Sequence, residues 1–208
     1  MSSTPVLEPP RGKAGGAGQS VRFIREFLSH PKRVGAVAPS SRFLAEKMVE
    51  GVNFARAGVV VEYGPGTGAF TREIVARLAP GARYFAVELS PRMAREWRRR
   101  HPGLRVHRDS VANMRAICDA EGVESVDVIV SGLPWASFDE GLQRELLGAT
   151  AAVLRPGGAL VTFGYRGASM LPAARRFRKL LPEYFSRVSR ARYVWRNLPP
   201  AFVIRCSR

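Results

Sequence analysis

The 208-residue chain suits one α/β domain with a single core and leaves little room for a second, and its 46% hydrophobic content is that of a globular protein. Its 33 Lys and Arg against 17 Asp and Glu give a formal net charge of +16, which favours a polyanionic partner (nucleic acid or an anionic membrane surface) unless it reflects only the Arg codons of a high-GC genome. Two cysteines exclude a disulfide framework and a cysteine-based zinc site, and no run approaches the roughly 18 apolar residues of a spanning helix, so we expect a cytoplasmic protein that meets a membrane only at its surface.

The N-terminal part is expected to lie outside the main domain. Residues 1–18 are rich in Ser, Pro and Gly and predict a disordered tail without a signal-peptide pattern. Residues 19–50 predict two helices that form a lid with membrane contact. The first is amphipathic, with Arg opposite bulky apolar residues, and ends before Pro31; it suits an anionic bilayer surface, although packing onto the domain explains the same pattern. The small-residue loop 35–41 leads into the second, capping helix from Arg42.

From residue 51 to residue 208, short apolar strands alternate with helices of roughly 10 to 15 residues. The expected strands cover residues 59–63, 84–87, 104–107, 126–130 and 159–165. The expected helices cover residues 70–78, 91–100, 112–120, 139–154 and 173–181. The segments 187–195 and 202–206 predict an antiparallel hairpin. The chain therefore predicts an α/β, Rossmann-like fold, with a seven-stranded, mostly parallel sheet that ends in an antiparallel C-terminal hairpin.

A glycine-rich turn follows the first expected strand directly. Gly64, Gly66 and Gly68 permit a tight turn and the close approach of a ligand to the backbone. Their spacing differs from the dinucleotide-binding fingerprint, and no Lys-Ser or Lys-Thr follows, which disfavours a phosphate-binding P-loop. Glu62, two residues before the first glycine, is expected to point from a buried strand into the same crevice.

Acidic residues at the ends of the next two strands extend this pattern. Glu88 and the adjacent Leu89 end the second strand, and an acid there can accept hydrogen bonds from both ribose hydroxyls of an adenosine. The alternative is an acid beside a helix N-cap. Asp109 and Ser110 end the third strand, where an acid or a hydroxyl can bind the adenine amine.

The run Val-Glu-Tyr-Gly-Pro-Gly-Thr-Gly, together with Glu88 and Asp109, resembles the first three motifs of class I S-adenosylmethionine-dependent methyltransferases. The resemblance covers nearly the whole chain after Val59. It implies S-adenosylmethionine as the cofactor, S-adenosylhomocysteine as the product and no metal. The residues implied to hold the cofactor are Glu62, Gly64, Gly66, Gly68, Glu88, Leu89, Asp109, Ser110 and Ser131.

The segment Ser131-Gly132-Leu133-Pro134-Trp135 follows the fourth strand at the mouth of the same crevice. Ribosomal RNA adenine dimethyltransferases carry Asn-Leu-Pro there, and the Asn grips the target amine; this chain has Gly132 in place of that Asn. Bacterial phospholipid N-methyltransferases are more similar, because they carry Ser-Gly-Leu-Pro. They also share Gly-Ala-Val-Ala-Pro-Ser-Ser, present here at 35–41, and a C-terminal strand that resembles 196–202.

That second resemblance implies stepwise methylation of the phosphatidylethanolamine amine towards phosphatidylcholine, by a monomer on the inner membrane without a stable protein partner. The sequence leaves open the number of methyl groups added and the acceptance of other amino-lipids, such as ornithine lipids. The predicted catalytic residues are Ser131 and Leu133, whose carbonyl oxygens face the cationic head group, and Tyr165 at the end of the fifth strand. An aromatic residue that caps the sheet edge explains Tyr165 equally well. Desolvation lowers the amine pKa without a dedicated base. The predicted substrate contacts are Arg33, Ser40, Trp135 and Tyr165.

Residues 166–208 hold eleven basic residues against Glu183 alone, which favours a docking surface for anionic membrane lipids. Two rival interpretations remain. In an rRNA adenine N6-methyltransferase the charge would serve RNA phosphates, but Gly132 and the short chain argue against it. A non-catalytic membrane- or RNA-binding module would retain only the fold, but the intact Glu62, glycines and Glu88 argue against that.

Overall fold

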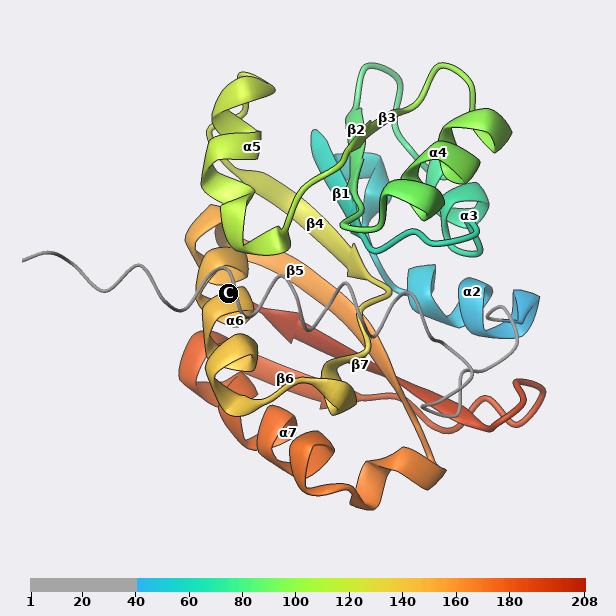
Figure 1. Cartoon of the computed structure of the whole chain (residues 1–208), viewed down its shortest axis with the longest axis vertical. Helices are drawn as coiled ribbons and strands as arrows, with labels where there is room; N and C mark the ends of the chain where they lie inside the picture. Colours follow the sequence, from blue (N-terminus) through green and yellow to red (C-terminus); the bar gives the residue numbers. More distant parts are fainter. Residues whose placement is uncertain (1–40) are drawn as a thin grey trace, which may run out of the picture.

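The computed structural model describes residues 41–208 (Figure 1). The predicted tail, the amphipathic helix and the predicted substrate contacts Arg33 and Ser40 lie outside these residues. A seven-stranded sheet in the order β3-β2-β1-β4-β5-β7-β6 runs through the molecule. Its strands are β1 (Val59–Tyr63), β2 (Arg83–Val87), β3 (Arg105–His107), β4 (Val126–Ser131), β5 (Leu154–Tyr165), β6 (Arg187–Arg190) and β7 (Ala201–Ser207).

The strand pairing explains where a ligand can bind. β1 to β5 pair in parallel, and β7 pairs antiparallel with both β5 and β6. The predicted mostly parallel sheet with an antiparallel C-terminal hairpin is thereby confirmed. The strand order reverses at β1, with β2 and β3 on one side and β4 and β5 on the other. In an open α/β sheet, the carboxyl ends of the strands at such a switch point form the ligand crevice.

Helices cover both faces of the sheet. They are α2 (Arg42–Val49), α3 (Thr71–Val75), α4 (Pro91–Arg100), α5 (Met114–Ala120), α6 (Glu140–Val153) and α7 (Pro172–Tyr184), with the 3-10 helices η2 (Phe54–Arg56), η3 (Val111–Asn113), η4 (Trp135–Ser137) and η5 (Gly167–Met170). Local caps set their starts: the Ser90 hydroxyl accepts from the Met93 amide before α4, and Asp139 accepts from the Leu142 amide before α6. Within residues 41–208, no helix is both long and apolar enough to cross a membrane.

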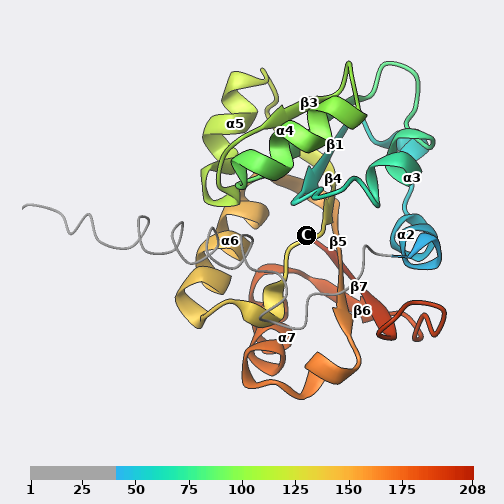
Figure 2. The same ribbon diagram turned by 45° about the vertical axis from the view of Figure 1, so that its right-hand side comes forward.

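Three layers result, with the sheet in the middle (Figure 2). On β1, Val60 packs with Leu44 of α2 and Ile74 of α3. Its neighbour Val61 points to the other face and joins the core that α5, α6 and α7 cover, for example through Leu146. The apolar run of β1 is therefore buried on both sides, as a parallel central strand requires.

Element boundaries differ from the sequence prediction by three residues or more in four places, one of which is the end of α7 at Tyr184 instead of residue 181. Helix α3 ends at Val75, three residues earlier than predicted. Strand β5 begins at Leu154, five residues before the predicted start at residue 159. Residues 155–158 bulge out between two pairs of the β4–β5 ladder and form an irregularity within the strand. The first hairpin strand ends at Arg190 instead of residue 195, and beyond it Val194 keeps only an isolated bridge to Ala201.

Candidate active site

The glycine turn after β1 has a backbone conformation that other residues rarely adopt. Gly64, Gly66 and Gly68 have φ values of 58°, 55° and 85°, in the left-handed region that favours glycine. The Gly64 amide donates to the Val87 carbonyl at 2.8 Å, which ties the turn to the end of β2. A Cβ atom at Gly64 would lie 3.0 Å from the Leu133 side chain. The turn therefore closes tightly between the ends of β2 and β4.

Glu88 meets this turn directly. Its side chain is buried, with Oε2 accepting from the Gly66 amide at 3.2 Å and Oε1 from the Ser90 amide at 2.8 Å. Burial raises its pKa, although these backbone N–H groups act in the opposite direction. A carboxylate offers about four acceptor positions, so Glu88 retains capacity for the two ribose hydroxyls of an adenosine. Leu89 follows it, half-buried against the core.

Glu62 forms the centre of a buried polar cluster beneath the turn. Its Oε2 accepts from the Thr71 hydroxyl at 2.8 Å and from the Tyr84 hydroxyl at 2.5 Å, and Trp97 Nε1 donates to the Thr71 hydroxyl at 3.0 Å. Burial raises the pKa of Glu62 to about 7, against the effect of the two hydroxyl donors. Its Oε1 atom is buried and has no partner among residues 41–208. That free acceptor fits a donor such as the amino group of S-adenosylmethionine.

Asp109 and Ser110 lie at the end of β3, where they cap the next helix. Asp109 Oδ1 accepts from the Ser110 amide at 2.6 Å and from the Asn113 side chain at 2.8 Å. The Ser110 hydroxyl accepts from the Ala112 amide at 3.2 Å. Their contact with the adenine base stays a prediction.

The loop after β4 is held by its own side chains. The buried Ser131 hydroxyl accepts from the Leu133 amide at 3.3 Å and from Trp135 Nε1 at 3.2 Å. The Ser131 carbonyl accepts from the Thr162 hydroxyl at 3.2 Å, and the Leu133 carbonyl accepts from the Trp135 amide at 3.0 Å. The predicted contact of both carbonyls with the acceptor amine stays a prediction, and the Ser131 hydroxyl shapes the loop.

Gly132 has no space for a side chain. A Cβ atom at this position would lie 2.6 Å from the Gly64 carbonyl oxygen, which belongs to the backbone. The Gly132 amide in turn donates to the Tyr63 carbonyl at 2.7 Å. The ends of β1 and β4 thus meet where the similar rRNA enzymes carry an Asn.

Two residues that the sequence did not indicate position the Trp135 side of the loop. Gln143 on α6 is buried, and its Nε2 donates to the Trp135 carbonyl at 2.8 Å and to the Ala173 carbonyl at 3.0 Å. The Trp135 ring stacks on Phe177 of α7, with ring centroids 4.7 Å apart. The loop is therefore tied to both helices that cover this face.

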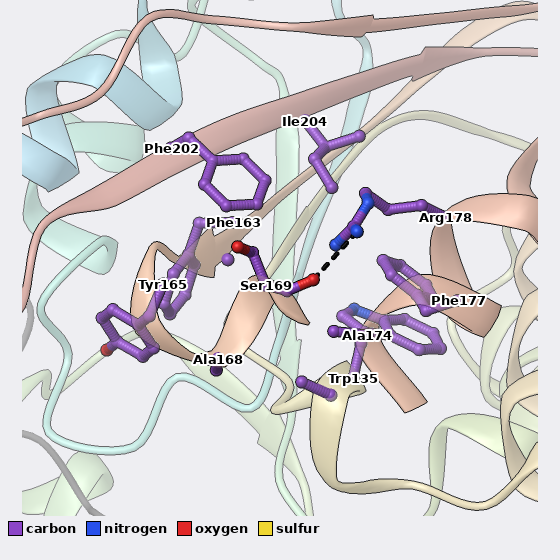
Figure 3. A pocket seen from close by; sticks show the side chains of 12 residues that line it. Trp135, Phe163, Tyr165, Ala168, Ser169, Ala174, Phe177, Arg178, Phe202 and Ile204 are labelled. Atoms are coloured by element: carbon purple, nitrogen blue, oxygen red, sulfur yellow. Dashed lines mark hydrogen bonds between the residues drawn. The ribbon is translucent and has the colours of Figure 1, made fainter. Parts of the chain in front are cut away.

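An aromatic cavity lies beside this loop (Figure 3). Its walls carry five rings, those of Trp135, Phe163, Tyr165, Phe177 and Phe202. Tyr165 lies at one side, in edge-to-face contact with Phe163, with the ring centroids 5.3 Å apart. Arg178 extends into the cavity from α7 and donates to the Ser169 carbonyl at 2.9 Å. The described residues that line this cavity include no carboxylate or imidazole. The two predicted substrate contacts Trp135 and Tyr165 therefore share one cavity.

Comparison with known proteins agrees with this geometry. A methyltransferase domain family model matches residues 60–158. An ornithine lipid N-methyltransferase from Singulisphaera acidiphila is 32% identical over 189 residues, which cover 88% of this chain and 93% of that protein. The structure of a Bacillus cereus O-methyltransferase with S-adenosylhomocysteine superposes with a TM-score of 0.64 at 17% identity, over 98% of this chain and 94% of the other. The Streptomyces achromogenes O-methyltransferase TomG gives 0.62 at 16% identity, over 91% and 88%.

The fold and the glycine turn with its two buried acids define a class I methyltransferase. The chain belongs to the S-adenosylmethionine-dependent methyltransferase family, and S-adenosylmethionine is its cofactor. The predicted cofactor is thus confirmed, and the similarity to a lipid N-methyltransferase leaves the acceptor to be identified.

Proposed function

We propose that this enzyme transfers methyl groups from S-adenosylmethionine to the primary amine of a membrane-lipid head group, with phosphatidylethanolamine as the acceptor. The observation that carries the proposal is the 32% identity to an ornithine lipid N-methyltransferase over 93% of that relative's length. Both lipids present a primary amine within a few bonds of an anionic oxygen group. The proposal therefore depends on a feature that the two head groups share.

The residues around the crevice suit such a reaction. When bound, S-adenosylmethionine supplies a methyl group on a sulfonium, which the lone pair of a neutral amine takes from sulfur, so that S-adenosylhomocysteine and a methylated ammonium result. Gly64 to Gly68 would lie against the cofactor, with Glu88 on its ribose and the free Oε1 of Glu62 available to its amino group. Each of these groups is already placed by the backbone or by buried hydrogen bonds, so little reorganisation is required on binding.

The aromatic cavity supports an amine as the acceptor. Aromatic faces attract ammonium and methylammonium groups, and Trp135 and Tyr165 line the cavity beside the loop. Burial among rings also lowers the pKa of the amine, so its proton leaves to solvent before transfer. The Arg178 guanidinium in the same cavity provides a counter-charge for the phosphate or carboxylate of the head group.

RNA is the alternative acceptor, and Gly132 argues against it. The rRNA enzymes that the loop resembles use an Asn side chain at this position to hold the target adenine. Here the Gly64 carbonyl occupies the space that any side chain would need. An adenine grip of that type has no equivalent in this loop.

A labelling experiment tests the acceptor. The full chain is incubated with methyl-radiolabelled S-adenosylmethionine and one of three substrates: vesicles with phosphatidylethanolamine, vesicles with ornithine lipid, or undermodified ribosomal RNA. We expect label in phosphatidylethanolamine. Label in ornithine lipid alone would overturn the choice of acceptor but keep a lipid amine, and label in RNA alone would overturn the proposal.

The same assay separates transfer by this site from a contaminating activity. Glu88→Ala removes the carboxylate that the cofactor ribose requires, so we expect labelling to fall by about 100-fold or more. Glu124→Gln alters an exposed acid remote from the turn and should leave the rate unchanged. Equal rates in the two variants would show that the glycine turn and Glu88 are not the site of transfer.

A further inference from the structure

We infer that two neighbouring loops of this protein form a docking surface for an anionic lipid bilayer. The docking surface consists of residues 167–171, which contain η5, and residues 191–200, which connect β6 to β7. This inference rests on the proposed function only because it takes a membrane lipid as the partner. It identifies the part of the protein that contacts the membrane.

Large apolar side chains are exposed in both loops. Met170 and Leu171 are 65% and 50% exposed, and Trp195 and Leu198 are 62% and 83% exposed. Elsewhere in residues 41–208, the exposed large hydrophobic residues are Val75 and Val188, at 36% and 38%. Single exposed apolar residues need no explanation, but a group of them in adjacent loops marks an interaction site.

The two loops lie side by side. The Arg166 amide donates to the Pro200 carbonyl at 2.8 Å, and the Arg166 guanidinium lies 5.2 Å from the centre of the Trp195 ring. Both views place η5 and the β6–β7 loop at the end of the sheet where β5 ends (Figures 1 and 2). Ala168 and Ser169 of η5 also line the aromatic cavity. The docking surface therefore borders the proposed acceptor site.

Basic residues are concentrated in the C-terminal part of the chain, which contains both loops. Residues 166–208 carry eleven basic side chains and one acid, whereas residues 41–165 carry sixteen basic and fourteen acidic ones. The single acid, Glu183, lies in the last turn of α7 and pairs with Arg144 at 2.7 Å. Within the described part of the chain, none of the eleven basic residues forms an ion pair. Arg205 and Arg208 donate to main-chain carbonyls toward the other end of the sheet, whereas the charge of basic residues in and beside the two loops, such as Arg166, Arg175 and Arg192, is left for an external anion.

The kind of side chain favours a bilayer over a nucleic acid. Single-stranded RNA binds to aromatic platforms, because bases stack on rings. Three of the four exposed residues here are aliphatic or thioether side chains, which gain free energy in the acyl region of a membrane. The Trp195 ring suits the interface between the acyl region and water, and the nearby Arg and Lys side chains suit anionic head groups. Together they match an anionic bilayer surface.

Vesicle flotation of the full chain tests the docking surface. The double variant Met170→Ser/Leu198→Ser should bind vesicles of phosphatidylcholine and phosphatidylglycerol about tenfold more weakly or worse, and its control Val75→Ser should bind as the wild type. Arg175→Glu/Lys179→Glu should weaken binding to these anionic vesicles, and its control Arg56→Glu/Arg72→Glu should not. Raising the salt from about 0.1 M to about 1 M should weaken the wild type, since the Debye length falls from about 10 Å to about 3 Å.

Wild-type flotation by the Met170→Ser/Leu198→Ser variant would overturn the docking surface. So would binding to single-stranded RNA, but not to vesicles, with an affinity that this variant leaves unchanged. Methyl transfer to amino-lipid dispersed in detergent micelles separates this inference from the proposed function: the variant should retain the wild-type rate there, because docking is not required. A wild type that floats with vesicles but labels no lipid would refute the proposed function and leave the docking surface standing.

Discussion

Gly132 and Gly64 lie where the ends of β1 and β4 come together, and the backbone itself fills the space between them. A Cβ atom at Gly132 would lie 2.6 Å from the Gly64 carbonyl oxygen. At Glu62 the constraint is different, since a buried carboxylate keeps one oxygen without a partner in residues 41–208. A close backbone contact and an unpaired buried carboxylate oxygen both lower the stability of a folded protein, and such features are typical of functional sites. Substitutions at Gly132 and Glu62 are therefore informative.

Gly132→Ala should destabilise the fold, because the backbone around Gly64 must shift to admit the methyl group. We expect a loss of about 1–3 kcal/mol in the free energy of unfolding, measured in urea, together with weaker S-adenosylmethionine binding. Gly167→Ala is the matched control, since a Cβ atom there would meet nothing within 4 Å. Wild-type stability and cofactor affinity in Gly132→Ala would contradict the close approach of the two strands.

Glu62→Gln should change how stability depends on pH. Burial raises the folded-state pKa of Glu62 to about 7 from an ordinary value of 4.5. Between these values the unfolded chain releases this proton while the folded chain retains it, so the wild type loses stability as the pH rises through this window. Gln carries no proton, and its stability advantage over the wild type should grow by on the order of 3 kcal/mol from pH 4.5 to 7.

Urea unfolding of the wild type and of Glu62→Gln across this pH range measures the difference between their free energies of unfolding. The contributions of the other titrating groups largely cancel in this difference. Glu124→Gln, at an exposed position, should show a difference that does not vary with pH. A constant difference for Glu62→Gln as well would contradict a raised pKa for Glu62.

Whole elements act together at the loop that ends β4. Ser131 shapes it from the strand, Gln143 holds it from α6, and Phe177 packs on its Trp135 from α7. Strand β5 contributes the Thr162 hydroxyl to the Ser131 carbonyl. A loop fixed from four elements can hold a small acceptor group in one orientation, which is what proximity contributes to a transfer rate.

Gln143→Leu tests this support. The substitution removes the buried side-chain amide that donates to the Trp135 and Ala173 carbonyls, so we expect a loss of about 1–3 kcal/mol in the free energy of unfolding. The rate of methyl transfer should fall by at least about tenfold while S-adenosylmethionine affinity is kept, because the cofactor turn is not touched. Glu145→Gln on the same helix should alter neither quantity. An unchanged rate in Gln143→Leu would remove the loop from the account of transfer.

At the scale of the whole molecule, the parallel strands bring three functions to one edge of the sheet. The glycine turn, which is predicted to hold the cofactor, follows β1, the proposed acceptor loop follows β4, and the proposed docking surface follows β5. The charge of the chain is also unevenly distributed: residues 41–165 carry nearly equal numbers of basic and acidic side chains, and residues 166–208 are strongly basic. Under the proposed function, a lipid amine can then reach the crevice while its acyl chains stay in the bilayer.

The sequence by itself determined the α/β fold class and the glycine turn, because both depend on local rules, and its resemblance to class I methyltransferases indicated the cofactor. Apolar runs of five residues form buried strands, left-handed turns need glycine, and an acid at the end of the second strand meets the first turn wherever this sheet forms. The antiparallel hairpin followed from the same reasoning. Its exact length did not, since pairing partners set where a strand ends.

Only the tertiary structure decided which side chains surround these motifs. Thr71, Tyr84 and Trp97 reach Glu62 from three different elements, and no spacing along the chain indicates that they meet. Gln143 and Phe177 are equally ordinary in the sequence, as a polar residue and an aromatic residue on amphipathic helices. Contacts of this kind depend on how helices pack across the sheet, which is a property of the folded molecule and not of any local segment.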